Sequence, residues 1–236
     1  IYLVWKDYKT RHRYIVGELS RNGKYEFKYR DEDINKAIEK GFEPLIAFPN
    51  INEVYENQDI FPAFSSRLPD KRRRDVKEIL AKYKLLKYDA FELLKKSGGK
   101  LPTDSLEFID PIFLDETNIE REFHIAGVRY YDYCDKENKC ARLKLEINEE
   151  LVLAKDCNNK YDKYAIKVKN KGNKVIGYIP VFFSKEISKA IESNREITCK
   201  VINYECNDVC EECIKVKITI IWWKFSALYN RAKVEK

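Results

Sequence analysis

The segment 158–168, NNKYDKYAIKV, decides how the second half of the chain is interpreted, together with GVRYY at residues 127–131. Both segments place tyrosines beside charged or amide side chains, where a short strand is expected to meet a loop. Aromatic faces stack on bases, a guanidinium meets phosphate, and a carboxylate accepts a hydrogen bond from a sugar hydroxyl. The two segments therefore predict a surface that holds a few unpaired nucleotides.

The rest of the second half is typical of short strands separated by turns. We predict strands over 123–131, 142–145, 151–154, 165–168, 175–179, 197–204 and 214–222. Ser184 is expected to cap a short amphipathic helix. Several strands with one helix favour a small barrel, and OB-like barrels commonly bind nucleic acid on a strand face. We therefore predict a small OB-like β-barrel with one or two short helices over residues 118–236.

The first half indicates a mixed α+β domain over residues 1–110. Strands are predicted over 1–5, 14–19 and 24–29, and helices over 31–39, 76–85 and 89–96. Asn22-Gly23 is expected to form the hairpin turn between the second and third strands. The proline-containing stretch 100–117 is predicted to be the boundary between the domains.

Composition excludes few classes of protein but sets the compartment that we expect. The 236 residues carry a net charge of +6, which suits nucleic acid without requiring it. No run approaches the ~20 apolar residues of a membrane span, and no signal-peptide pattern opens the chain. The seven cysteines are an odd number without secretory context, so we expect a reducing cytoplasm and no disulfide scaffold.

Cys206, Cys210 and Cys213 form the one cluster of thiols close in sequence. A zinc site normally needs four ligands in paired knuckles, whereas these three are unevenly spaced. We therefore predict neither a metal nor a cofactor, with zinc as the alternative to an ordinary hairpin tip.

Each nucleotide-binding feature also has an ordinary explanation. If Tyr130 and Tyr131 lie on a strand, neighbouring side chains face opposite ways, so at most one belongs to the core. The other would then be a partly exposed tyrosine beside a solvated Arg129. Asp162 could simply cap the turn or pair with a neighbouring lysine.

Three motifs in order nevertheless resemble the HIRAN domain over roughly residues 122–222: GVRYY, then NNxYDKxAIxV, then IGYIP at 176–180 followed by a helix. HIRAN domains occur in fork-remodelling helicase-like proteins and in some bacterial proteins. The resemblance implies an OB-like barrel that holds the 3′ end of single-stranded DNA.

The resemblance also implies roles for individual side chains. Tyr130 and Tyr161 would stack on the terminal bases, while Asp162 would accept a hydrogen bond from the free 3′-hydroxyl. Arg129 would meet phosphate, and the two asparagines would shape the loop around the end. The complete set of predicted DNA-binding residues is Arg129, Tyr130, Tyr131, Asn158, Asn159, Tyr161, Asp162, Lys163 and Tyr178.

The sequence departs from the HIRAN pattern at three positions. Lys160 stands where the family often has proline, and Tyr164 where it often has asparagine. Val181 stands where a basic residue frequently follows the Ile-Pro step, and this change is expected to cost one phosphate contact.

Residues 14–70 resemble the N-terminal subdomain of HipA-type toxin kinases. The resemblance is carried by VGEL at 16–19, YEFKY at 25–29, Pro44-Leu45 and the stretch FPAF to RLP at 61–69. The kinase core is absent from the sequence: it has no glycine-rich phosphate loop, no catalytic Asp-plus-Asn loop and no metal-binding Asp motif. Such a detached subdomain is expected to dock on a partner, with Phe61 and Phe64 either exposed for docking or buried within the chain.

The densest positive cluster is Lys71, Arg72, Arg73 and Arg74. Such a run is ordinarily a solvated surface, but it could also follow the phosphate backbone of DNA next to the barrel. Catalysis finds little support, because His12 and His124 lie in different predicted domains and no carboxylate pair or nucleophile–histidine arrangement stands out.

These observations predict a two-domain cytoplasmic protein of bacterial type that is not an enzyme. Its expected partner is single-stranded DNA with a free 3′ end, and its expected role is that of a sensor or targeting subunit. The alternative is an antitoxin-like subunit that docks on a separately encoded HipA-type kinase, with the barrel as scaffold.

Overall fold

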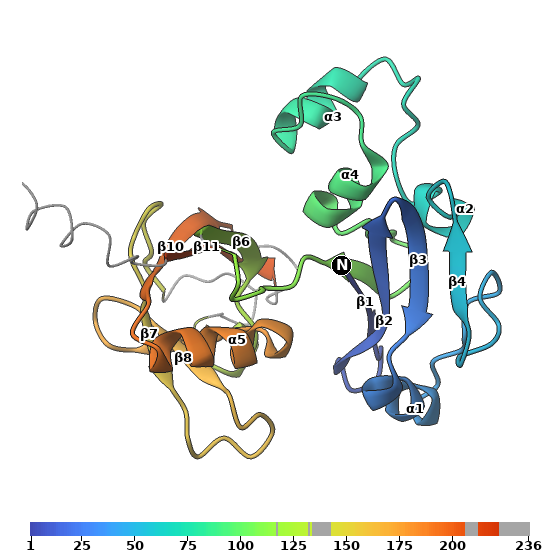
Figure 1. Cartoon of the computed structure of the whole chain (residues 1–236). Helices are drawn as coiled ribbons and strands as arrows, with labels where there is room; N and C mark the ends of the chain where they lie inside the picture. Colours follow the sequence, from blue (N-terminus) through green and yellow to red (C-terminus); the bar gives the residue numbers. More distant parts are fainter. Residues whose placement is uncertain (117, 132, 134–142, 206–211, 222–236) are drawn as a thin grey trace, which may run out of the picture. The chain divides into compact units, whose positions relative to one another are not determined.

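A computed structural model describes residues 1–236 except 117, 132, 134–142, 206–211 and 222–236 (Figure 1). The chain divides into two compact units, Ile1–Pro111 and Ile112–Lys236. Each unit has its own sheets and its own buried side chains, so each is described by itself.

Unit 1 is built on a five-stranded antiparallel sheet with the strand order β4-β3-β2-β1-β5. Its strands are β1 (Tyr2–Lys6), β2 (Arg13–Asn22), β3 (Lys24–Tyr29), β4 (Val54–Asn57) and β5 (Leu106–Ile109). Its helices are α1 (Asp31–Glu39), α2 (Pro62–Ser65), α3 (Val76–Lys82) and α4 (Ala90–Ser97). Gly23, with φ of 75°, turns the chain from β2 into β3 as the sequence predicts.

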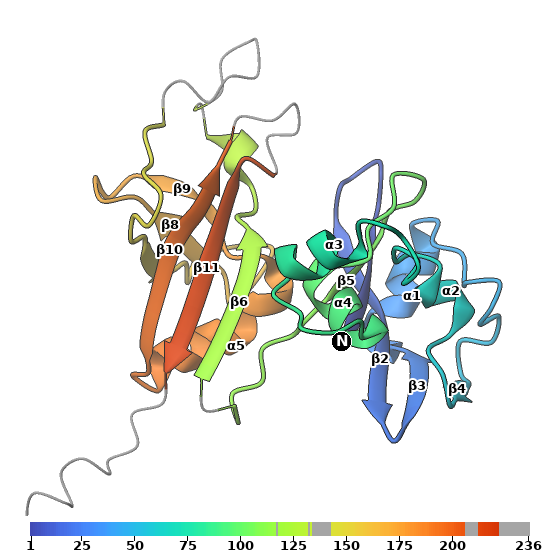
Figure 2. The same ribbon diagram turned by 90° about the horizontal axis from the view of Figure 1, so that it is seen from above.

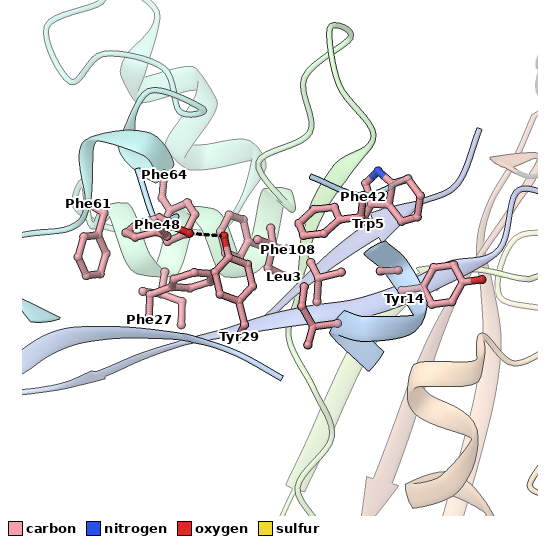
Figure 3. Close-up of a cluster of buried hydrophobic side chains, with 14 of the residues drawn as sticks. Leu3, Trp5, Tyr14, Phe27, Tyr29, Phe42, Phe48, Phe61, Phe64 and Phe108 are labelled. Atoms are coloured by element: carbon pink, nitrogen blue, oxygen red, sulfur yellow. Dashed lines mark hydrogen bonds between the residues drawn. The ribbon is translucent and has the colours of Figure 1, made fainter. Parts of the chain in front are cut away.

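Aromatic side chains fill the core of unit 1 (Figure 3). The ring centroids of Phe27 and Phe48 lie 4.5 Å apart, and those of Phe27 and Phe64 lie 5.1 Å apart. The hydroxyl of Tyr29 donates to the carbonyl of Phe48 at 2.8 Å, which ties the 42–48 loop to the sheet. Because Phe61 and Phe64 are both buried in this cluster, the idea that they are exposed for docking is wrong.

The stretch 100–117 is more than a linker. Leu106–Ile109 forms β5, which pairs with β1 as an edge strand of the unit 1 sheet. Four residues between two prolines are too short to show a clear alternation, which is why the sequence did not indicate a strand. Unit 1 ends just after this strand, at Pro111.

Unit 2 contains two three-stranded antiparallel sheets, β10-β11-β6 and β7-β8-β9 (Figure 2). Their strands are β6 (Asn118–His124), β7 (Val152–Lys155), β8 (Ile166–Lys169), β9 (Val175–Tyr178), β10 (Glu196–Tyr204) and β11 (Ile214–Ile221). The helix α5 (Val181–Glu192) follows β9, and a short 3₁₀ helix, η1 (Val128–Tyr130), follows β6. Ile119, Val168, Ile176 and Ile187 are fully buried in its core.

Two isolated antiparallel bridges link these sheets. Ala126 and Tyr178 exchange two backbone hydrogen bonds of 2.8 Å, and Glu150 pairs with Lys200. Among the described residues the ladders do not merge into one closed sheet, so the structure shows a mixed unit with two sheets where the sequence predicted an OB-like barrel.

Several predicted elements of unit 2 have different bounds. The strand predicted over 123–131 ends at His124, because the chain turns into η1. Residues 143–145 form no strand, and residue 142 lies outside the described residues. Ser184 is not a helix cap: α5 begins at Val181, and the buried Ser184 hydroxyl donates to the Val181 carbonyl inside the helix.

Candidate nucleic-acid interface

The helix η1 positions Arg129 and Tyr130. Gly127 precedes it with φ of 75°, a left-handed conformation that favours glycine and directs the chain away from β6. Within the single turn Val128 points into the core, whereas the Tyr130 side chain is 74% exposed. The Arg129 guanidinium donates to the Tyr130 hydroxyl at 2.7 Å and lies 4.8 Å from the ring centroid. The turn therefore presents a cation and an aromatic ring together.

The loop between β7 and β8 presents Tyr161. The side-chain oxygen of Asn159 accepts hydrogen bonds from the backbone amides of Tyr161 at 2.9 Å and Asp162 at 3.0 Å. Asp162 in turn accepts from the amide of Tyr164 at 2.8 Å through Oδ1. These local bonds compete with strand pairing, so β8 starts only at Ile166, one residue after the start of the predicted strand 165–168. Held this way, Tyr161 is 97% exposed.

Tyr178 joins the three motifs. Its backbone pairs with Ala126, directly before Gly127 and η1. Its hydroxyl donates to Oδ2 of Asp156 at 2.9 Å, and the carbonyl of Asp156 accepts from the Asn159 amide at 3.1 Å. One residue of β9 therefore connects the η1 turn, through its backbone, with the loop that carries Tyr161, through its side chain.

Asp156 is a positioning residue that the sequence did not indicate. Its Oδ1 lies 3.0 Å from the ammonium of Lys167 on β8, and the hydrogen bond with Lys167, followed by that with Tyr178, holds the pKa of Asp156 below its usual value. Burial, and then hydrogen bonds with Tyr131 and Asp156, raise the pKa of Tyr178. Its position between a strand and an Asn-Asn pair was the available signal, but its partner lies 22 residues away in sequence.

Close packing of backbone against backbone also joins β9 to the η1 turn. A Cβ atom at Gly177, which has φ of 156°, would lie 2.7 Å from the carbonyl oxygen of Ala126 and 3.1 Å from Cγ2 of Ile125. Cβ atoms essentially never lie within 3.0 Å of another atom, so glycine is strongly favoured at this position. A Cβ at Gly127 would lie 3.6 Å from the Tyr130 ring and 3.9 Å from the Tyr178 ring, which places both rings beside this backbone.

The remaining predicted residues of unit 2 have varied environments. Asn158 is exposed, and the ammonium of the exposed Lys163 lies 5.0 Å from the centroid of the Tyr164 ring. Tyr131 is half-buried and stacks on Tyr133, with their centroids 6.1 Å apart. Tyr130 and Tyr161 are thus the strongly exposed tyrosines of the predicted set.

The basic run 71–74 lies in unit 1, while the other predicted site residues lie in unit 2. All four of its side chains are exposed. Arg72 pairs with Asp70 at 2.9 Å and Arg73 pairs with Asp75 at 2.7 Å, each with a carboxylate two residues away.

Other kinds of site are not evident in the described part of the chain. It contains no group of three or more His, Cys, Asp or Glu side chains that could hold a metal ion. Of the predicted thiol cluster, Cys213 is buried, and Cys206 and Cys210 lie outside the described residues. No helix among the described residues has the length and apolar character needed to cross a membrane.

In the comparison with known proteins, each half of the chain matches a different family model. The model of the HIRAN domain matches residues 120–221, and that of the HipA N-terminal domain matches residues 11–102. The solved HIRAN domain of human HLTF is 26% identical, with a TM-score of 0.31, over 46% of this chain and 81% of that chain. A solved protein from Lactobacillus plantarum is 16% identical, with a TM-score of 0.33, over 44% of this chain and 96% of that chain. No curated protein matches the chain. The first half therefore matches the HipA N-terminal domain, and the second half matches the HIRAN domain.

Proposed function

We propose that unit 2 binds single-stranded DNA and holds its free 3′ end. The observation that carries this proposal is the exposure of two tyrosines, Tyr130 at 74% and Tyr161 at 97%, on turns whose backbones are fixed by hydrogen bonds. Exposed rings on a rigid frame lose little conformational freedom when a base stacks on them. The match of residues 120–221 to the HIRAN domain supports the same choice of ligand.

We further propose that the two sheets of unit 2 form an OB-like barrel. The bridge between Ala126 and Tyr178 joins β6 to the β9 side of the second sheet, and the bridge between Glu150 and Lys200 joins its β7 side to β10. With these two bridges the strands follow one another around a ring. The Ala126 bridge lies directly beside the candidate interface, so this junction would set the spacing between its two turns.

Selectivity for a 3′-hydroxyl would come from Asp162. Its Oδ1 is engaged by the Tyr164 amide, whereas Oδ2 has no hydrogen-bond partner among the residues that the structure describes. A carboxylate oxygen accepts a hydrogen bond from a hydroxyl but repels a phosphate dianion. The site would therefore distinguish a 3′-hydroxyl from a 3′-phosphate without recognising the base sequence. This selectivity suits a sensor or targeting subunit, and it requires no catalytic step.

Fluorescence anisotropy with labelled single strands tests the proposal. Each base stacked on an aromatic ring contributes ~1–3 kcal/mol, so Tyr130→Ala and Tyr161→Ala should each weaken binding about 5- to 150-fold. Tyr8→Ala is the matched control, because Tyr8 is a 76% exposed tyrosine in unit 1. Equal binding by the parent and both unit 2 variants would refute the assigned surface.

Asp162→Asn tests the reading of the end separately from stacking. Asparagine keeps an oxygen for the Tyr164 amide, so the loop should be retained while the negative charge is lost. The parent should prefer a 3′-hydroxyl over a 3′-phosphate oligonucleotide, and the variant should bind both similarly. An unchanged preference in the variant would remove Asp162 from the mechanism.

A second candidate function follows from unit 1. The match of residues 11–102 to the HipA N-terminal domain favours docking on a separately encoded HipA-type kinase, with unit 2 as scaffold. Co-purification of the full chain with such a kinase, and a fall in kinase activity on adding the chain, would support this candidate. Unchanged kinase activity at saturating concentrations of the chain would count against it.

A further inference from the structure

Positive charge is concentrated in one segment of unit 1. Residues 67–100 hold 12 of the 45 basic residues but only 5 of the 39 acidic ones. This segment therefore carries a charge of +7, and the remainder of the chain carries −1. A distribution this uneven creates a local positive potential that the modest net charge of the chain conceals.

The segment consists of α3, α4 and their connections, and the two helices lie next to each other (Figure 1). Its cations differ in how far carboxylates already neutralise them. Arg67, which is almost fully buried, makes a two-pronged ion pair with Asp104 and also donates to the carbonyls of Gly99 and Leu106, so its role is structural. Seven exposed cations have no carboxylate partner among the residues that the structure describes: Lys71, Arg74, Lys77, Lys82, Lys84, Lys87 and Lys96.

One of these lysines occupies a position where glycine is favoured. Lys84 follows α3 with φ of 55°, its amide donates to the Ala81 carbonyl at 3.0 Å, and the Leu85 amide donates to the Leu80 carbonyl at 2.9 Å. This is the Schellman pattern, in which the left-handed residue is usually glycine. The fold therefore retains a strained residue that carries a positive charge to the surface.

A cavity of about 400 Å³ opens between α3 and α4. Its walls include the apolar side chain of Ile79 and the ring of Tyr83, and Lys82 and Lys100 also line it. No acidic residue lines it. Lys100 pairs with Glu107 at 3.0 Å, whereas Lys82 has no carboxylate partner among the described residues and is a side chain of the kind that contacts DNA phosphates.

From the charge, the seven cations and this cavity we propose that the basic segment, residues 67–100, binds the phosphate backbone of double-stranded DNA. This surface needs no strand end, and it belongs to unit 1, whereas the two tyrosines belong to unit 2. A lipid surface fits less well, because Leu86, which is fully exposed, is the segment's one large exposed hydrophobic among the described residues. Backbone contacts by seven cations would make the affinity strongly dependent on salt.

A duplex closed by hairpin loops at both ends, with an internal fluorophore, is the appropriate probe because it has no 3′ end. The full-length parent should bind it, and the dependence on salt should be steep. The double variant Lys82→Ala/Lys87→Ala removes two phosphate contacts. Raising the salt from about 50 to 200 mM should therefore weaken its binding less than that of the parent, by a factor of roughly three for each contact removed. Lys28→Ala with Lys40→Ala is the control, because it removes the same charge from exposed sites of unit 1 outside the segment.

The same titration separates this proposal from the function proposed for unit 2. The double variant Tyr130→Ala/Tyr161→Ala should bind the closed duplex as tightly as the parent does. Its affinity for 3′-ended single strands should be lost. The proposal is overturned if the parent does not bind the closed duplex, or if the control pair weakens binding as much as the test pair. It is also overturned if vesicles rich in anionic lipid bind the parent more tightly than the duplex and lose that binding in the test pair.

Lys84→Gly is a second test, in which the stability of unit 1 should rise while the affinity for DNA falls. Glycine relieves the left-handed strain, so unit 1 should resist higher urea concentrations, and a folding defect cannot explain weaker binding. Affinity for the closed duplex should fall about threefold at moderate salt, since one contact is lost. Greater stability with unchanged affinity would exclude Lys84 from the surface.

Discussion

Gly177→Ala tests the junction on which the candidate interface of unit 2 depends. The added methyl would lie 2.7 Å from the Ala126 carbonyl oxygen, well inside the usual contact distance for a Cβ atom. Relief would require Ala126 to move, although it is held by two 2.8 Å hydrogen bonds to Tyr178. The backbone also has φ of 156° there, which side chains rarely adopt.

The expected loss of stability can be estimated from these contacts. Two net hydrogen bonds contribute about 1 kcal/mol each, and a residue in an unfavourable backbone region costs of order 1–3 kcal/mol. We therefore expect Gly177→Ala to lower the free energy of unfolding of unit 2 by about 3–5 kcal/mol. With the free energy of unfolding falling by about 2 kcal/mol per molar urea, the urea midpoint of unit 2 should fall by roughly 1.5–2.5 M.

Hydrogen exchange with mass spectrometry during a urea titration is the suitable assay, because it reports on peptides from each unit separately. Peptides of unit 2 should lose protection at lower urea, while those of the unit 1 sheet should not change. Gly172→Ala is the matched control: its φ is not in the left-handed region, and the nearest atom to its Cβ is a side-chain oxygen of Asn170 at 3.4 Å.

An unchanged midpoint for Gly177→Ala would refute the reasoning. It would mean that β9 does not approach Ala126 closely, and that Tyr178 does not hold the η1 turn beside the loop of Tyr161. Weaker binding of single-stranded DNA should accompany the lost stability, since the spacing between the two rings depends on the same junction.

Four further outcomes are expected. Tyr178→Phe removes the hydrogen bond to Asp156, so peptides of the 156–165 loop should exchange faster. Single-stranded DNA should also bind more weakly, although the rings of Tyr130 and Tyr161 are unchanged. Since the pKa of Asp156 is lowered from 3.8 and that of Tyr178 is raised from 10.0, this link should persist between those two pH values. Its stabilisation, measured as loop protection, should vanish only as pH falls through the lowered pKa or rises through the raised one. Burial raises the pKa of Cys199 to about 12, so alkylation at mildly alkaline pH should label the exposed Cys157 and spare Cys199 until the protein unfolds. Arg67→Lys cannot reproduce a two-pronged ion pair with additional bonds to two carbonyls, and should lower the urea stability of unit 1 by about 2–3 kcal/mol.

Local signals in the sequence predicted much of unit 1. The bounds of α1 and β3 agree with the predicted ranges because periodic apolar residues and the Asn22-Gly23 turn act over a few neighbouring positions. β5 was missed because its place in the sheet comes from pairing with β1, about a hundred residues earlier in the chain. Pairing over that distance leaves no mark on a four-residue stretch.

In unit 2 the sequence identified the motifs and misjudged their conformations. The strand predicted over 123–131 runs through GVRYY, whereas β6 ends at His124 and the left-handed Gly127 begins the turn that exposes Tyr130. Asn159 could have been recognised as a turn residue whose side chain accepts hydrogen bonds from the backbone amides that follow it. Such a turn places the start of β8 further along the chain. The link from Tyr178 to Asp156 could not have been predicted, because it depends on how β9 packs against the start of a distant loop.

The two proposed surfaces differ in the interaction that would dominate each, and this difference makes them separable. Unit 2 presents Tyr130 and Tyr161, and stacking on a ring changes little with ionic strength. The basic segment of unit 1 presents seven exposed cations. Their contribution to affinity declines steeply with salt, because the release of counterions from DNA is less favourable when the salt concentration is high. At high salt the protein should therefore retain its selectivity for single-stranded 3′ ends while its affinity for closed duplex is lost. At low salt both surfaces would contribute, so 3′-ended single strands and closed duplex should both bind.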